Sequence, residues 1–99
     1  MKKTKQIERI EEMERLFDDS IESLKEFEKS LKKFKKVQKN IEVLESYYTS
    51  KDWRKDFEDD EKGKFNNLKR GVLSEDGIYN LLQDYKSIQR KLEKVGKKY

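Results

Sequence analysis

Residues 5–48 read KQIERIEEMERLFDDSIESLKEFEKSLKKFKKVQKNIEVLESYY and form nearly half of the chain. Its apolar side chains recur every three or four positions, about 3.4 on average, which is typical of packed helices and not of an alternating β-strand. No Gly or Pro interrupts the pattern, and Thr4 is a predicted N-cap. The stripe consists of Ile7, Ile10, Met13, Phe17, Ile21, Leu24, Phe27, Leu31, Phe34, Val37, Ile41, Leu44 and Tyr48. The sequence therefore predicts one long helix over about residues 5–48.

A short second helix is predicted over about residues 51–62, KDWRKDFEDDEK. Ser50 can cap its start, and Gly63 can close its end. Trp53 and Phe57 are its only apolar face, so this helix must lean on another part of the chain. The segment 63–73 that follows, GKFNNLKRGVL, is predicted to be a loop. We expect its apolar residues to pack under the bundle, and these are Phe65, Leu68, Val72 and Leu73.

The third helix has the clearest start signal in the chain. Ser74 is the predicted N-cap, and Leu73 and Ile78 occupy the positions of a hydrophobic staple. Apolar residues then continue at heptad spacing to Val95, and Gly96 allows the end to fray. The predicted helix covers about residues 75–96.

Together the patterns predict an all-α fold with a single domain over residues 1–99. The long N-terminal helix packs antiparallel against the C-terminal helix, and the short middle helix completes a helical hairpin or three-helix bundle. At 1.5 Å per residue the first helix is roughly 65 Å long and the third roughly 32 Å, so the third covers only half of the first. Either the first helix bends back around residues 38–40, or a second copy covers its stripe. The stripe drifts out of one strict heptad, which favours packing in a bundle over a long parallel zipper. We favour the homodimer.

Composition excludes most catalytic and metal-binding chemistry. The 99 residues include no Cys and no His, so the chain has no thiolate nucleophile, imidazole base, disulfide or zinc-finger ligand set. Carboxylates are abundant, but acid–base catalysis needs a pair in a cleft, which a slim hairpin does not offer. The acidic run 56–61 has Glu61 where an EF-hand needs Gly, and we expect it to pair with lysines elsewhere or to be recognised by a basic protein. We therefore expect no enzyme activity, no catalytic residue, no cofactor and no metal.

Targeting signals are also lacking. No apolar run approaches the roughly 20 residues that span a bilayer, and no apolar segment follows the basic start MKKTK as in a signal peptide. We expect a cytoplasmic protein without a membrane span.

An aromatic group flanks the predicted second helix and has two interpretations. As core, it staples the short helix to the other two. As a site, it forms a partner-binding patch, because Trp, Tyr and Arg dominate interface hot spots. The candidate partner-binding residues are Tyr47, Tyr48, Trp53, Arg54, Arg70 and Tyr79.

A lysine cluster on the first helix supports an alternative function. Its members are Lys29, Lys32, Lys33, Lys35, Lys36 and Lys39. Such a cluster could follow a phosphate backbone, or it could be the solvated side of an amphipathic helix. The chain has a net charge of only +4, and 20 of its 25 basic residues are Lys, whereas Arg is preferred for base contacts. The solvated side is the favoured interpretation, and a nucleic-acid-associated accessory protein is the alternative.

Three segments resemble a known bacterial family. IERIEEMERLFDD, YYTSKDWRKDFEDDEKGKF and LKRGVLSEDGIYNLL are similar to domain-of-unknown-function family 4298, small proteins found mostly in Gram-positive bacteria. The resemblance covers nearly the whole chain, and the stretch 70–82 is its most specific part. It implies a complete single-domain helical protein and brings no activity, substrate or catalytic residue. The expected function is that of a non-enzymatic adaptor that acts by protein–protein contact, with itself as the first partner, through the first helix.

Overall fold

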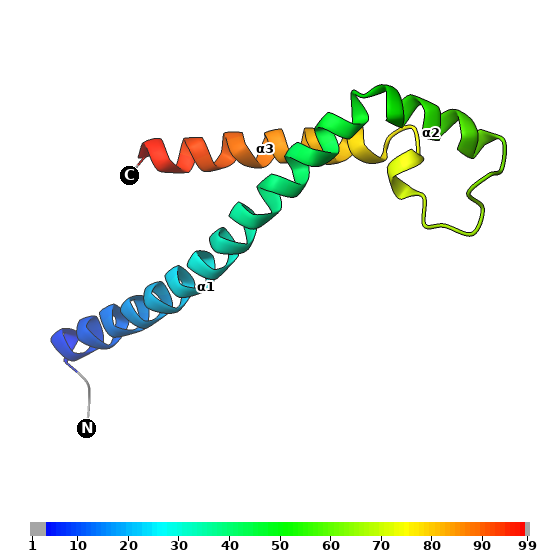
Figure 1. The fold of residues 1–99 in the computed structure, drawn as a ribbon. Coiled ribbons are helices and arrows are strands. Elements are labelled where there is room, and N and C mark those ends of the chain that lie inside the picture. Colours follow the sequence, from blue (N-terminus) through cyan, green and yellow to red (C-terminus); the bar gives the residue numbers. More distant parts are fainter. Residues whose placement is uncertain (1–3, 99) are drawn as a thin grey trace. The chain divides into compact units, whose positions relative to one another are not determined.

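The computed structural model describes residues 4–98, and these form helices joined by short connections (Figure 1). The order is α1 (Lys5–Tyr48), α2 (Lys51–Glu61), the short 3-10 helix η1 (Gly71–Leu73) and α3 (Gly77–Lys98). No strand occurs among these residues. The prediction of an all-α fold with a long, a short and a C-terminal helix is confirmed.

Side-chain oxygens cap the first two helices as predicted. Thr4 Oγ1 accepts a 3.1 Å hydrogen bond from the N–H of Ile7 at the start of α1. Ser50 Oγ accepts a 3.2 Å bond from the N–H of Trp53 at the start of α2, and it donates a 2.6 Å bond to the carbonyl of Tyr47. These oxygens satisfy N–H groups that have no partner inside the helix, which explains why each helix begins at these residues.

Gly63 closes α2 as predicted, and the last helical residue lies one position before the predicted one. Its φ of +84° lies in the left-handed region that favours glycine. The N–H of Gly63 donates to the carbonyl of Asp60 at 2.9 Å, and the N–H of Lys64 donates to the carbonyl of Asp59 at 3.3 Å. This pair of bonds is a Schellman motif, which satisfies the last carbonyls of the helix. The helix therefore ends at Glu61 and not at residue 62.

The start of α3 differs from the prediction by two residues. Ser74 Oγ accepts a 3.0 Å bond from the N–H of Gly77, as an N-cap does, but it also donates a 2.9 Å bond to the carbonyl of Gly71. Ser74 therefore links η1 to α3, and residues 74–76 form the bend between them. The helix begins at Gly77 and continues past Gly96 to Lys98, where the prediction ended it at residue 96.

The chain divides into two units, one up to Gln38 and one from Lys39 onward. The described part of the first unit is helical throughout, and α1 continues as helix through residues 38–40. No Gly or Pro lies at these residues to interrupt the helical hydrogen bonds.

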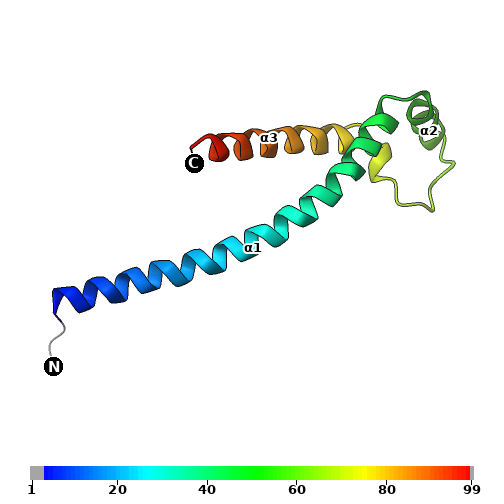
Figure 2. The same cartoon turned by 60° about the vertical axis from the view of Figure 1, so that its left-hand side comes forward.

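The second unit contains the buried core. Its buried apolar residues are Ile41 in α1, Leu73 in η1 and Ile78 in α3. Within this unit α3 starts beside the end of α1 and runs in the opposite chain direction, which Figures 1 and 2 both show. Burial falls along α3 from Ile78 to Val95, of which 64% is exposed. The predicted antiparallel arrangement is confirmed for this part of α1.

The loop between α2 and α3 is less buried than predicted. Leu73 is buried and Phe65 is half-buried, but Leu68 and Val72 are exposed. The prediction that the four apolar residues of this segment pack under the bundle is therefore wrong for Leu68 and Val72. The carbonyl of Val72 accepts a hydrogen bond from α2, and this holds the backbone of the loop against the helix while the Val72 side chain faces solvent.

Candidate interaction site

The hydroxyl of a half-buried tyrosine links α1 to α2. Tyr47 Oη donates a 2.6 Å hydrogen bond to Asp56 Oδ2 across the corner. Burial raises the pKa of Tyr47 to about 12, and the hydrogen bond and the negative charges of Asp56 and Asp52 act in the same direction. The hydroxyl therefore remains a neutral donor at ordinary pH and serves as a structural link.

Trp53 joins three elements. Its ring meets Tyr48 edge-on at a centroid distance of 5.0 Å and stacks on Phe57 at 5.1 Å. Its Nε1 donates a 2.8 Å hydrogen bond to the carbonyl of Val72 in η1. Both aromatic geometries are favourable, and the polar edge of the indole is satisfied. The Trp53 side chain thus connects α2 both to the end of α1 and to η1.

Two carboxylates of the acidic run of α2, Asp59 and Asp60, pair with basic residues of their own unit, which is one of the two expected outcomes. Asp59 is buried, with Lys55 Nζ 3.4 Å from Oδ1 and Lys64 Nζ 3.5 Å from Oδ2. Burial alone raises the pKa of Asp59, but the two lysines outweigh it and hold the pKa below its usual value. Asp60 Oδ1 accepts a 2.7 Å bond from Arg70 Nη1. Among the described residues no group of acidic side chains could hold a metal ion.

The structure separates the six candidate partner-binding residues into two sets. Tyr47, Tyr48, Trp53 and Arg70 make the internal contacts given above. Arg70 remains exposed while it makes its contact. Arg54 and Tyr79, of which 51% is accessible, are exposed as well and make none of these contacts. The contacts show what the first set does inside the fold: its side chains hold α2 and the following loop to the end of α1.

Two open hollows flank the loop before α3, and sequence reasoning missed both. One, of about 370 Å³, is lined mainly by apolar side chains, including Leu44, Ile78 and Leu81. The other, of about 260 Å³, brings Tyr47 and Arg70 together. The hollows share Lys69 and Val72 in their linings. The one feature of the sequence that could have indicated the hollows is the apolar composition of the loop. Composition does not predict whether an apolar side chain fills a hollow or lines its wall.

Exposed large apolar side chains recur along α1 in the first unit. Residues at least 39% exposed there are Ile7, Ile10, Met13, Leu16, Phe17, Ile21, Leu24, Phe27 and Val37. Nearly all belong to the predicted stripe, and we call them the α1 stripe. No residue of the first unit from position 4 onward is buried. A contiguous run of large apolar side chains of this kind is a mark of an interaction surface.

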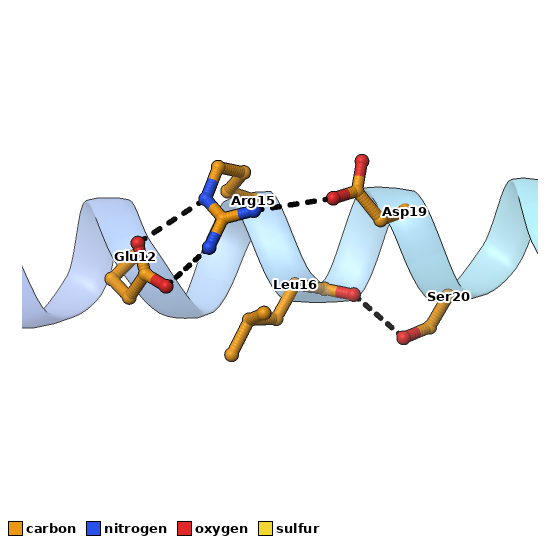
Figure 3. Close-up of polar contacts among 5 residues, drawn as sticks. All are labelled: Glu12, Arg15, Leu16, Asp19 and Ser20. Carbon is orange, nitrogen blue, oxygen red and sulfur yellow. Dashed lines mark hydrogen bonds and ion pairs between the residues drawn. The ribbon is translucent and has the colours of Figure 1, made fainter.

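Residues 10–34 of α1 keep one heptad register. The a positions are Ile10, Phe17, Leu24 and Leu31, and the d positions are Met13, Ser20, Phe27 and Phe34. The predicted drift out of one strict heptad is wrong over these residues, because the stripe passes from the a positions to the d positions of a single register. Figure 3 shows the opposite sides of the helix: Arg15 joins Glu12 and Asp19 by ion pairs on one side, and Leu16 projects from the other. Ser20 Oγ donates a 2.7 Å bond to the carbonyl of Leu16.

The six lysines of the predicted cluster are all exposed. Lys39 belongs to the second unit and the other five to the first. At 100° per residue these five fall within about 160° of the α1 surface, on the side away from Phe34. Lys32 lies 3.7 Å from Glu28, an exposed ion pair one turn apart. The lysines of the first unit therefore share one face of α1 and are accessible.

None of the helices within residues 4–98 is both long enough and apolar enough to cross a membrane. Comparison with curated proteins finds no match, and comparison with solved structures finds none. One protein family matches, described as Domain of unknown function (DUF4298), and it covers residues 10–94 of the 99. The match includes α2, η1, the whole aromatic corner and most of α1 and α3. The chain belongs to the DUF4298 family.

Proposed function

We propose that the protein is non-catalytic and acts by protein–protein contact, and that it self-associates through the α1 stripe. The observation that carries the proposal is the exposure of the stripe: Phe17 is 60% exposed and Leu24 is 70% exposed. Exposed aromatic and leucine side chains at a positions are stabilised when a second helix covers them.

Helix lengths support a second chain as the cover. The 22 residues of α3 extend about 33 Å, whereas the 44 residues of α1 extend about 66 Å. Even a fully antiparallel α3 would leave half of α1 uncovered, and α2 has only 11 residues. Two copies of α1 have equal lengths and the same stripe, so each can cover the other.

The first test is the molecular mass in solution, measured by light scattering behind size exclusion across a range of concentrations. We expect a dimer that persists at high salt, because apolar contacts are not screened by ions. A strict monomer at high micromolar concentration would overturn the proposal.

A matched pair of variants localises the interface. Replacing Phe17 and Leu24 by Gln removes two a positions, and we expect the dimer to dissociate. Replacing Glu22 and Lys29 by Gln changes the outward f positions by the same number of residues and leaves the net charge the same. This control should remain a dimer. Equal behaviour of the two variants would place any interface elsewhere.

The accessible lysine face supports a second candidate, a nucleic-acid-associated accessory protein. Lysines on one helix face can neutralise successive phosphates, so binding should weaken steeply with salt. The test is the anisotropy of labelled duplex and single-stranded DNA at low salt. Reversing Lys32, Lys33, Lys35 and Lys36 to Glu should abolish binding. Reversing Lys86, Lys91, Lys94 and Lys97 in α3 gives the same net charge and should not. Absence of binding at low salt would exclude this candidate.

A further inference from the structure

The charges of α1 are segregated along its length. From Glu8 to Glu28 the helix carries nine carboxylates and three basic residues, a net charge of −6. From Lys29 to Gln38 it carries five lysines and no carboxylate. A parallel, in-register pair of helices would place acid beside acid and lysine beside lysine. An antiparallel pair places the acidic part of each helix against the lysines of the other, which lowers the electrostatic energy of association.

The apolar register leads to the same orientation. In an antiparallel pair of helices each a residue faces a d residue of the other helix. One alignment sets Leu24 opposite Phe27 of the second copy, with the two-fold axis between them. The same alignment sets Phe17 opposite Phe34 and Leu31 opposite Ser20. All of these positions lie within the first unit, and each a residue from 17 to 31 meets a d residue.

Charges on the edge of this seam agree with that alignment. The e positions face each other across an antiparallel pair, and here Glu14 lies opposite Lys35 of the second copy. Both side chains are exposed on α1 and so are accessible to a second chain.

We propose that two copies of the chain pair through α1 in antiparallel orientation, with Leu24 opposite Phe27 and Glu14 opposite Lys35. This inference rests on the proposed self-association and adds its orientation and register. The α1 stripe is then covered by the α1 stripe of a second copy, which runs in the opposite direction. The pairing brings the acidic and basic parts of the two helices together at both ends of the seam.

The absence of cysteine makes the orientation directly measurable. Two single-cysteine full-length variants, Ser20→Cys and Leu31→Cys, are tagged with different masses and oxidised separately and as a mixture. In the proposed pair, each cysteine lies about 16 Å along the axis from its own copy but directly opposite the other variant's cysteine. A disulfide needs Cα atoms within about 7 Å. We expect a disulfide only in the mixture, between the two differently tagged chains.

Other results of the same experiment overturn the proposal in distinguishable ways. Disulfides in each separate sample would show parallel pairing. No disulfide in any sample, with a dimer by light scattering, would show another interface or register and leave the self-association intact. A monomer by light scattering would overturn the proposed function as well.

A charge exchange tests the register without cysteine. Glu14→Lys places a lysine opposite Lys35 at both symmetric positions, and we expect the dissociation constant of the dimer to rise about five-fold at low salt. Adding Lys35→Glu to the same chain restores opposite charges and should restore the affinity. In a parallel pair these residues are about 32 Å apart, so the second change would not compensate the first. Failure of this rescue would contradict the proposed register.

Discussion

Tyr47 Oη donates a 2.6 Å hydrogen bond to Oδ2 of Asp56, and this bond joins the last turn of α1 to the middle of α2. Burial of the ring, the bond itself and the charge of Asp56 together raise the pKa of Tyr47 to about 12. The bond closes the corner on which the rest of the second unit is arranged.

This bond predicts an alkaline limit to stability. The unfolded pKa of Tyr is about 10, so the neutral hydroxyl stabilises the fold fully below about pH 10, and this contribution is lost as the pH rises through about 12. We expect Tyr47→Phe to lower the free energy of unfolding by roughly 1 kcal/mol near pH 8. The difference from the wild type should shrink between about pH 10 and 12. Urea unfolding at several pH values measures it. Tyr79→Phe removes the hydroxyl of an exposed tyrosine and is the matched control, which should leave the free energy of unfolding near pH 8 unchanged.

Removal of the Trp53 side chain should loosen the second unit. Trp53→Leu loses the contacts with Tyr48 and Phe57 and the bond to the Val72 carbonyl, and we expect a loss of about 2 kcal/mol of unfolding free energy. Trp53→Phe keeps a ring but not the N–H, and should lose about half as much. Unfolding is followed by circular dichroism, because Trp53 is the only tryptophan. Equal losses for the two variants would show that the hydrogen bond dominates.

Two glycines of α3 should respond to alanine with opposite signs. A Cβ at Gly77 would collide with the carbonyl oxygen of Gly71 and lie 2.6 Å from Ser74 Oγ, so Gly77→Ala must displace η1. We expect Gly77→Ala to lower the free energy of unfolding by at least roughly 1 kcal/mol. A Cβ at Gly96 meets nothing within 4 Å, and Gly96→Ala should stabilise α3 by about 0.5 kcal/mol. Thermal unfolding of both variants measures these changes in stability. A Gly77→Ala variant as stable as the wild type would contradict the close approach of residue 77 to the carbonyl of Gly71.

The serine caps should each contribute measurably. Ser50→Ala and Ser74→Ala remove oxygens that accept N–H bonds at helix starts, and we expect each to lower stability by about 1 kcal/mol. Ser23→Ala, at an exposed position inside α1, removes no cap and should not destabilise. Urea unfolding of the three variants measures the effect. A loss at Ser23 as large as at the caps would show that capping is not the cause.

Most of the helical architecture was predictable because its determinants are local. The starts of α1 and α2 follow from Thr4 and Ser50, each of which accepts a hydrogen bond from the residue three positions on. The end of α2 follows from Gly63 and its left-handed φ. The start of α3 was misplaced because Ser74 also bonds back to Gly71, and the resulting 3-10 turn has no signature that separates it from a loop.

The candidate sites were predictable in part. The α1 stripe and the lysine cluster follow from periodicity alone, since positions three and four apart share a helix face. Whether the aromatic residues form core contacts or an exposed binding patch could not be predicted from the sequence, because it depends on which residues each side chain contacts in the fold. Trp53 bonds to a carbonyl 19 residues away, and Arg70 pairs with a carboxylate 10 residues away. Both partners are set by the path of the loop.

The amino-acid sequence thus specifies that the chain is helical, where the long helix runs and which of its faces is apolar, because caps and periodicity act over a single turn. In contrast, the burial of Leu73 and Ile78 and the exposure of Leu68 and Val72 depend on how the elements pack. All four are apolar residues in or beside one loop, and local pattern treats them alike. Their burial differs because the bonds from Trp53 and Ser74 fix how the backbone turns, and these bonds form only when α2, η1 and α3 come together.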